Sequence, residues 1–284
     1  MGFGIAQSLL RAGHQVHGYD VNAANTQRFV DEGGAPGNLI DAASTLDIAL
    51  VCVLNAAQTE SVLFGGDKPL VPLLPDNSVV IACATVAPEF ARDMQTRCLE
   101  HQVAYLDAPM SGGSVKAAKG QLTYMASGSE QAFELARPAL DASAQQVFRL
   151  GDEAGMGSAM KAVNQMLAGV HIAAMAEALT FGMSQGIQPD RFLEIISQCA
   201  GTSWMLENRA PHVISGDYTA HSSVNIWPKD LGIVMDIAHK SSFSAPLTAA
   251  ALQQFVAAAG SGLGQEDDAA VAKVYARNAG LELP

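Results

Sequence analysis

Short apolar runs that alternate with helical patterns constrain the fold of the first half of this chain more than any other feature. The runs at 47–54 (DIALVCVL) and 78–85 (SVVIACAT) have the length and β-branched content of parallel strands that are buried on both faces. Further strands are predicted at 15–20, 102–109, 121–128 and 145–151, and intervening helices at 2–12, 22–32 and 56–65. Strands that alternate with helices predict an open, doubly wound parallel α/β sheet.

The pattern changes after Gly151, where helical periodicity replaces strands up to the C-terminus. We therefore predict two domains, 1–151 and an all-α domain at 152–284. The first helix of the second domain could extend over more than 30 residues, and such a long helix usually packs across a domain or subunit interface. We expect a homodimer or homotetramer through the stretch at 154–187. Polar residues such as Lys161 and Glu177 interrupt this stretch, which favours a buried helix of a soluble protein over a membrane span.

The overall charge excludes some classes of partner. The formal net charge is -12, with 16 Lys and Arg against 28 Asp and Glu. No basic stripe is present to bind nucleic acid or an anionic membrane surface. The four cysteines show no C-x-x-C spacing, and the histidines show no zinc-ligand spacing, so no metal is expected. Free thiols and the lack of a visible secretory signal predict a cytoplasmic protein.

The N-terminal segment up to Asp20 contains parts of a dinucleotide-binding unit of the Rossmann type. Such a unit has a strand, G-x-G-x-x-G, a helix, a second strand and then an acidic residue about 20 positions on. Met1 and Gly2 fit the last two positions of the glycine motif, and Asp20 follows Gly2 at close to the expected spacing. A carboxylate there binds the ribose hydroxyls and repels a 2′-phosphate, which favours NAD over NADP. Asp20 could equally be a helix cap.

The sequence contains no first strand and no leading glycines of this unit. We therefore expect the natural reading frame to extend upstream of Met1. A first strand would complete the sheet, and its glycine loop would supply amides for the pyrophosphate.

The stretch DAPMSGG (107–113) places a bare turn between two apolar runs. Gly112 and Gly113 leave backbone amides uncovered, and the Ser111 hydroxyl adds a donor. This turn can form a small anion nest suited to a carboxylate, although a plain tight turn is the alternative.

Lys161 lies within a helical pattern with Gly157 before it and Asn164 and Gln165 after it, at spacings that place all four on one face. A surface lysine is the ordinary interpretation. The amide side chains beside it favour an enclosed polar pocket instead. If Lys161 takes a proton from a hydroxyl there, it must be neutral part of the time, a form favoured by burial and by a neighbouring cation such as Lys229 or the oxidised nicotinamide ring.

Asn55 and Thr85 each follow a predicted buried strand at its carboxyl end. Open parallel sheets bind ligands at this edge, so both residues are candidates for cofactor binding.

Four motifs in order resemble the β-hydroxyacid dehydrogenases, which include 3-hydroxyisobutyrate dehydrogenase and tartronate semialdehyde reductase. The motifs are the MG…GH.V..YD segment at the N-terminus, DAPMSGG with GQLT, GMGSAMKAVNQ (155–165) and WPKDLGIV (227–234). The resemblance covers the whole chain and implies a Rossmann-type NAD-binding domain followed by a helical substrate and dimerisation domain. The segment 201–234 looks most like the L-threonate branch of the family.

The resemblance also implies roles for individual residues. Lys161 would be catalytic, the Ser111–Gly113 turn would hold the substrate carboxylate, and Asn164 and Gln165 would contact the substrate. Lys229 would lie near the nicotinamide, although Lys229 and Asp230 could form an ordinary solvated ion pair. Asp267 resembles a family acid near the cofactor, and a helix N-cap explains it equally well.

These features predict an NAD-dependent oxidoreductase that removes hydride from a small hydroxy acid, with L-threonate oxidised at C2 as the first expectation. The alternative substrates are 3-hydroxyisobutyrate and glycerate, whose oxidation gives tartronate semialdehyde. The alternative from another class is a non-catalytic family member that cannot hold NAD, because the leading glycines are lacking.

Overall fold

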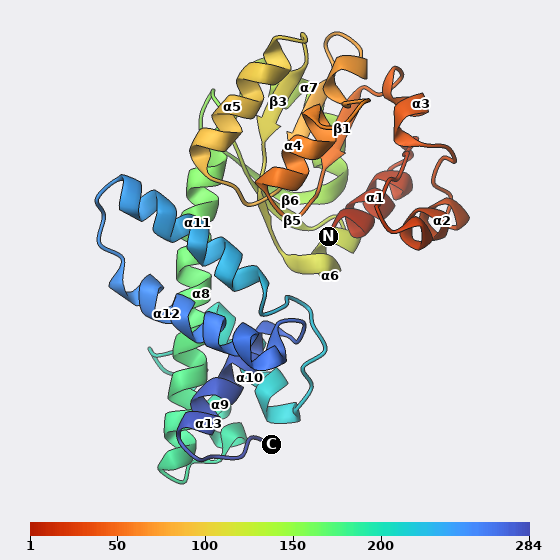
Figure 1. Cartoon of the computed structure of the whole chain (residues 1–284). Helices are drawn as coiled ribbons and strands as arrows, with labels where there is room; N and C mark the ends of the chain where they lie inside the picture. The colour runs from red at the N-terminus through yellow and green to blue at the C-terminus, as the bar shows by residue number, and fades with distance from the viewer. The chain divides into compact units, whose positions relative to one another are not determined.

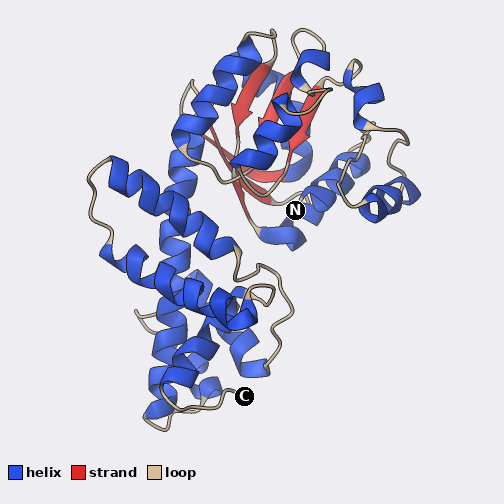
Figure 2. Cartoon of the chain, in the orientation of Figure 1, coloured by secondary structure: helices blue, strands red, loops and turns tan.

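A computed structural model describes all 284 residues, and its chain divides into two compact units, Met1–Lys161 and Ala162–Pro284 (Figure 1). This division falls ten residues after the boundary predicted at 151. The reason is that the start of the long helix α8 (Met156–Ser184) hydrogen-bonds to residues of the first unit. The first unit contains all the strands and the second is helical, as Figure 2 shows.

The first unit is built on parallel strands, which confirms the predicted Rossmann-type α/β fold. The strands are β1 (Ile48–Val51), β2 (Val79–Ala82), β3 (Ala104–Asp107), β4 (Met110–Ser111), β5 (Leu122–Ala126) and β6 (Ala144–Arg149). β1, β2 and β3 are parallel in that order. β5 pairs with β6 in parallel and with the short β4 antiparallel. An antiparallel bridge from Asp107 to Ser127 joins the end of β3 to the residue that follows β5.

The strand predicted at 15–20 does not form. His17 pairs with Ala35 in an isolated parallel bridge, and the Ala35 amide donates to the Val16 carbonyl at 2.8 Å. A strand needs a row of backbone partners. This segment has a partner at one position only, so it stays extended without entering a sheet.

The central strand β2 explains why helices cover both faces of the sheet. All four of its residues are buried. Val80 and Ala82 belong to one apolar cluster, and Val79 and Ile81 belong to another. Successive side chains of a strand point to opposite faces, so each face of β2 contributes to a separate core.

Three helices of the first unit precede β1, and the others lie between the strands in sequence. They are α1 (Gly2–Arg11), α2 (Ala23–Asp31), α3 (Leu39–Ala43), α4 (Ala56–Phe64), the 3-10 turn η1 (Val71–Leu73), α5 (Pro88–Leu99), α6 (Gly113–Ala118) and α7 (Glu130–Ser143). α1 packs closely on α6. A Cβ at Gly4 would lie 2.7 Å from the Ala118 amide nitrogen, and the buried Ser8 hydroxyl donates to the Ala117 carbonyl at 2.8 Å. Arg11 donates to the Ala118 carbonyl.

The second unit is a helical bundle around one apolar core. With most of α8 it comprises α9 (Pro189–Ile196), α10 (Trp204–Ser215), α11 (Ile226–Lys240), α12 (Pro246–Ala258), the π turn η2 (Ala259–Leu263), the 3-10 turn η3 (Asp268–Val271) and α13 (Ala272–Asn278). Met175 and Leu179 of α8 pack in the same core as Trp227 and Phe255. The rings of Trp227 and Phe255 stack at 5.4 Å.

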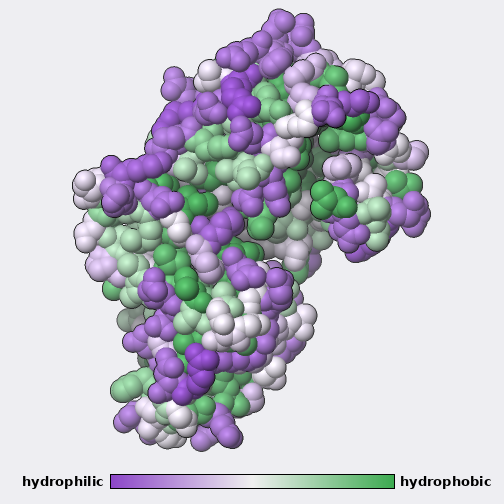
Figure 3. Space-filling model, in the orientation of Figure 1, coloured by the Kyte–Doolittle hydropathy of each residue, from purple (hydrophilic) through white to green (hydrophobic).

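α8 has 29 residues, slightly fewer than the more than 30 expected for the first helix of the helical region. It is long and apolar enough by composition to cross a membrane, and 44% of its most apolar window is buried within the protein. Its buried side chains supply part of the core of the second unit, as expected for a core helix. Figure 3 shows hydrophilic residues spread among apolar ones over the visible surface of each unit.

Candidate active site

The Ser-Gly-Gly turn (Ser111–Gly113) joins β4 to α6. Gly112 and Gly113 have φ angles of 138° and 74°, values that favour glycine. A Cβ at Gly112 would lie 3.1 Å from a methyl of Leu122. Both positions therefore favour glycine for their backbone conformation, and a side chain at Gly112 would also be tightly packed. The turn leaves its backbone uncovered, as an anion nest requires.

Lys161 is buried, with 8% of its surface exposed, so it is not a surface lysine. Its Nζ donates to the carbonyl of Met110 at 2.9 Å. Met110 directly precedes Ser111, so the structure brings the lysine amine beside the Ser-Gly-Gly turn. Two features that lie far apart in the sequence thus meet in one unit.

Asp107, which the sequence analysis did not select, anchors the start of α8. It is 1% exposed, and its Oδ2 accepts from the amides of Gly155 at 2.9 Å and Ser158 at 2.8 Å. Its Oδ1 accepts from the Ser158 hydroxyl at 2.7 Å, and the Ser127 hydroxyl lies at 3.4 Å from Oδ2. Burial raises the pKa of Asp107, although the hydrogen bonds from Ser158, Gly155 and Ser127 oppose the shift.

The predicted dinucleotide residues lie at the start of the first unit. α1 begins at Gly2, and its N-cap Met1 makes no side-chain cap bond. A Cβ at Gly2 would lie 3.4 Å from the Cβ of Cys52, so α1 begins close to the end of β1. Asp20 is exposed, and its Oδ1 accepts from the Asn22 amide at 2.8 Å.

Asn55 and Thr85 follow neighbouring parallel strands, with Val51 of β1 opposite Ala82 of β2. Their positions therefore lie at the same edge of the sheet. Asn55 caps α4 by accepting from the Gln58 amide at 2.9 Å, and Thr85 is half-buried. A helix N-terminus without a side-chain cap, a close α1–β1 approach and polar residues at this edge suit a dinucleotide.

In the second unit, Asn164, Gln165 and Lys229 are linked through a further residue, Asp230. Asn164 Nδ2 donates to Gln165 Oε1 at 2.9 Å, and Gln165 Nε2 donates to Asp230 Oδ2 at 2.5 Å. Lys229 Nζ lies 2.5 Å from Asp230 Oδ1. Asp230 is only 2% exposed, so the Lys229–Asp230 pair is not a solvated surface pair. The sequence analysis noted Asp230 only as the partner of Lys229.

Asp267 is completely buried in the second unit. It caps η3 by accepting from the Ala269 amide at 3.1 Å, and it also binds His212 Nδ1 at 2.9 Å and the His221 amide at 3.0 Å. Both carboxylate oxygens are thus engaged by protein groups. These contacts support the helix-cap interpretation of this residue.

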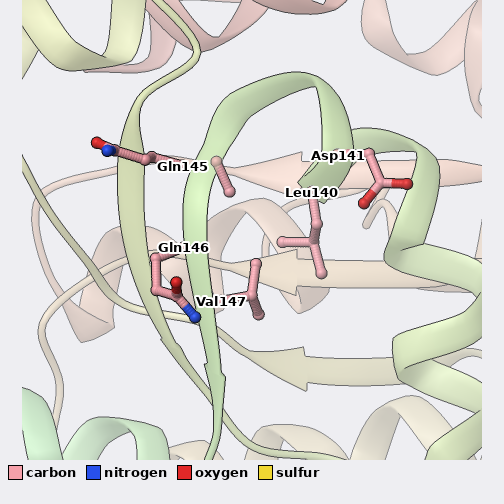
Figure 4. Close-up of a pocket in the computed structure, with 6 residues that line it drawn as sticks. Leu140, Asp141, Gln145, Gln146 and Val147 are labelled. Carbon is pink, nitrogen blue, oxygen red and sulfur yellow. The ribbon is translucent and has the colours of Figure 1, made fainter.

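A cavity of about 400 Å³ lies at the junction of α7 and β6. Figure 4 shows its lining side chains, which are Leu140, Asp141, Ala144, Gln145, Gln146 and Val147. None of the predicted site residues lines it. The candidate active site of the first unit is instead formed by the Lys161 amine and the Ser-Gly-Gly turn, which the hydrogen bond to Met110 brings together.

Comparisons with known proteins identify the family. Residues 1–151 match the NAD-binding domain of 6-phosphogluconate dehydrogenase, and residues 155–275 match the domain described as the NAD-binding domain of NADP-dependent 3-hydroxyisobutyrate dehydrogenase. The crystal structure of 3-hydroxyisobutyrate dehydrogenase from Salmonella typhimurium superposes with a TM-score of 0.90 at 42% identity, covering 96% of this chain and 95% of that one. The chain belongs to the β-hydroxyacid dehydrogenases.

This β-hydroxyacid dehydrogenase is similar to named relatives over its full length. It is 49% identical to the L-threonate dehydrogenase of Cupriavidus necator and 43% identical to that of Pectobacterium atrosepticum, covering 95% and 93% of those chains and all of its own. The predicted family and enzyme class are confirmed: the chain is a nicotinamide-dependent hydroxyacid dehydrogenase. The first family model also bears out NAD as the cofactor.

Proposed function

We propose that this enzyme oxidises L-threonate at C2 with NAD as hydride acceptor. The relatives named L-threonate dehydrogenase, at 43–49% identity over the whole chain, support this substrate. The observation that carries the chemistry is the hydrogen bond from Lys161 Nζ to Met110, which holds a buried amine beside a turn able to bind a carboxylate.

In this proposal the turn binds the acid group. The amides of Gly112 and Gly113 and the hydroxyl of Ser111 donate to the substrate carboxylate. Lys161, in its neutral form, accepts the proton of the substrate hydroxyl that is oxidised, and it returns that proton when the reaction runs in reverse. Bound NAD would supply the acceptor for the hydride that leaves the same carbon, and the residues assigned below would hold it. Because Lys161 is buried, the proton is transferred in a site with little competing water.

Lys161→Ala tests the catalytic assignment. We expect kcat to fall about 100- to 10,000-fold, the usual effect of losing a positioned general acid/base. NAD affinity and the circular dichroism spectrum should be unchanged. Lys119→Ala, which removes an exposed lysine at the end of α6, is the matched control and should retain full activity.

The assays should compare L-threonate with 3-hydroxyisobutyrate, because the Salmonella relative carries the latter name. A Lys161→Ala enzyme that keeps more than about a tenth of wild-type kcat would overturn the general acid/base role.

The cofactor assignments rest on the start of the first unit. Gly2 opens α1 beside β1, Met1 precedes it, and Asn55 and Thr85 lie at the carboxyl edge of the sheet. We assign these four residues and Asp20 to NAD binding, with Asp20 on the ribose hydroxyls.

Asp20→Ser should relax the preference for NAD, because a 2′-phosphate would no longer meet a carboxylate. The measurement is kcat/KM with NAD and with NADP for both proteins. Equal values for the two cofactors in the wild-type enzyme would remove Asp20 from this role.

We also propose roles for the residues of the second unit that are linked through Asp230. We assign Asn164 and Gln165 to the substrate and Lys229 to the cofactor, as the family resemblance implies. The burial of Asp230 supports these assignments, since it fixes both Lys229 and Gln165. Asp267 is not assigned to NAD, because its oxygens already bind His212, His221 and Ala269.

We also propose a cytoplasmic homodimer or homotetramer that associates through α8. Val163, Leu167 and Phe181 of this helix are large apolar side chains that are each more than half exposed, which supports a surface that contacts another subunit. All four cysteines are free thiols, as in a reducing compartment.

A further inference from the structure

The start of α8 is tied to the segment that leads into the Ser-Gly-Gly turn at two matched points. Ser158 of α8 binds Asp107 through both its amide and its hydroxyl. Three residues further along both segments, Lys161 Nζ binds the carbonyl of Met110. The start of the helix is therefore joined to this segment at two contacts, with the Asp107 carboxylate at one and the Lys161 amine at the other.

The contact at Asp107 leaves little room for α8 to shift. A Cβ at Gly157 would lie 2.5 Å from the Met125 carbonyl oxygen and 2.7 Å from that of Asp107. The Gly157 amide also donates to the Ser127 hydroxyl at 2.9 Å. The first turn of the helix thus lies directly against the ends of β3 and β5, with its amides directed at the Asp107 carboxylate and the Ser127 hydroxyl.

We propose that Asp107 is a positioning residue that sets the location of Lys161 against the Ser-Gly-Gly turn. Asp107 does not touch the reacting atoms in this account. It acts through Ser158, one helical turn before Lys161, and through its own place on the segment that carries the turn. The inference rests on the proposed role of Lys161 as general acid/base.

The chemistry of this contact explains why a carboxylate is suited to it. Two amides and a hydroxyl of the α8 start point at Asp107, together with the hydroxyl of Ser127. A carboxylate accepts all of them, whereas an amide side chain would direct its own N–H groups at one set of donors. Misplacement of a catalytic group by about 1 Å can cost on the order of 100-fold in rate.

If Asp107 had a purely structural role, weakening its contacts would lower stability without a specific loss of kcat. Two variants at buried serines distinguish this role from the positioning role. Ser158→Ala removes one hydrogen bond to Asp107 and leaves the amide bond. Ser143→Ala is the matched control: Ser143 is equally buried in the same unit, and its hydroxyl binds Ala139 and Tyr124, away from α8. Both changes remove one buried hydroxyl.

The experiment measures kcat and KM with L-threonate and NAD, and urea unfolding, for the full chain carrying each change. We expect Ser158→Ala to lower kcat about 10-fold and Asp107→Asn about 100-fold, with KM for NAD unchanged. Ser143→Ala should reduce stability as much as Ser158→Ala while keeping wild-type kcat. Equal kcat for the two serine variants would overturn the positioning role. The comparison of these two variants tests the proposal even if the Asp107→Asn protein fails to fold.

Lys161→Ala in the same series separates this inference from the proposed function. An active Lys161→Ala enzyme refutes the general acid/base role and the positioning role with it. An inactive Lys161→Ala enzyme together with a fully active Ser158→Ala enzyme refutes only the positioning role.

Discussion

The two units each bury an aspartate at the start of a helix, but they compensate its charge differently. In the first unit, Asp107 receives hydrogen bonds from amides and hydroxyls alone. In the second unit, Asp267 and Asp268 lie beside cationic groups. Arg209 binds Asp268 at 2.5 Å and lies 3.9 Å from Asp267, which also binds His212.

This difference in surroundings shifts the pKa values of Asp107 and Asp267 in opposite directions. Burial raises the pKa of Asp107, and its neutral donors only partly oppose the shift. Burial would also raise the pKa of Asp267, but the hydrogen bonds from His212, His221 and Ala269 and the charge of Arg209 lower it. The pKa of Asp268 stays raised, since burial outweighs Arg209 and the negative charge of Asp267 adds to the shift.

The comparison shows that a buried aspartate at a helix start does not have one fixed behaviour. Amides and hydroxyls orient the Asp107 carboxylate without neutralising it. At Asp267, hydrogen bonds from histidine and the backbone, with the charge of Arg209, favour the ionised form.

Among these changes, removing the Arg209 guanidinium should reduce the free energy of unfolding the most. Arg209→Met leaves Asp268 and Asp267 buried without their guanidinium, and we expect the free energy of unfolding to fall by about 3–5 kcal/mol. Urea unfolding followed by circular dichroism measures the change. Arg191→Met, which removes an exposed arginine paired with Glu194, is the control and should leave the unfolding curve in place. A similar loss in both variants would show that the buried pair has no special role.

Because the pKa values of Asp107 and Asp267 shift in opposite directions, their contributions to the free energy of unfolding should change with pH in opposite directions. The folded state holds the Asp107 proton more tightly than the unfolded chain does. Its stabilisation is therefore complete below the ordinary pKa of 3.8 and is lost as pH rises through the raised pKa of the folded state. Asp267 has a lowered pKa, so it stabilises the protein above 3.8, and this contribution is lost as pH falls through its lowered pKa.

Asp107→Asn and Asp267→Asn test this contrast by urea unfolding at several pH values. Each change should cost about 1–3 kcal/mol through impaired hydrogen bonding. The cost of Asp107→Asn should be larger near pH ~4 than near pH ~7, and that of Asp267→Asn should be larger near pH ~7. The same pH trend in both variants would contradict the comparison.

Replacing a neutral helix cap should reduce the free energy of unfolding the least, and by the same amount in both units. Ser129 caps α7 in the first unit at 3.2 Å from the Ala132 amide, and Ser203 caps α10 in the second at 3.1 Å from the Leu206 amide. Replacing either with Ala should cost about 1 kcal/mol at every pH tested. If the loss of stability at either serine depended on pH, the contrast between Asp107 and Asp267 would come from the units that surround them and not from their own titration.

Much of the fold could be predicted because apolar runs such as 78–85 can be satisfied only by burial on both faces, as β2 shows. The segment 15–20 (QVHGYD) was also predicted as a strand, but it pairs only at His17. Strand formation depends on partners from elsewhere in the chain, which a local pattern does not contain.

The candidate site was predictable where residue type dictates chemistry, as for Lys161 and the glycines at 112 and 113. Asp107 was missed, and Asp230 was noted only as the partner of Lys229, because a single acid beside a strand or a lysine has ordinary interpretations. A signal for Asp107 was present: the stretch EAGMGS before Lys161 has no Ser, Thr, Asp or Asn directly before the helix to cap it. Its amides therefore needed an acceptor from a distant segment.

The bonds from α1 to α6 also bear on the order in which the first unit can assemble. Ser8 and Ala117 are 109 residues apart, and Arg11 reaches Ala118 across a similar separation. The neighbouring strands β1 and β2, by contrast, pair residues that are much closer in the sequence, as for Ile48 and Val79. Closing the longer loop costs more chain entropy and comes later in folding. During synthesis on the ribosome, α1 must therefore wait for α6 to emerge, and its apolar face stays open to chaperones and proteases until then.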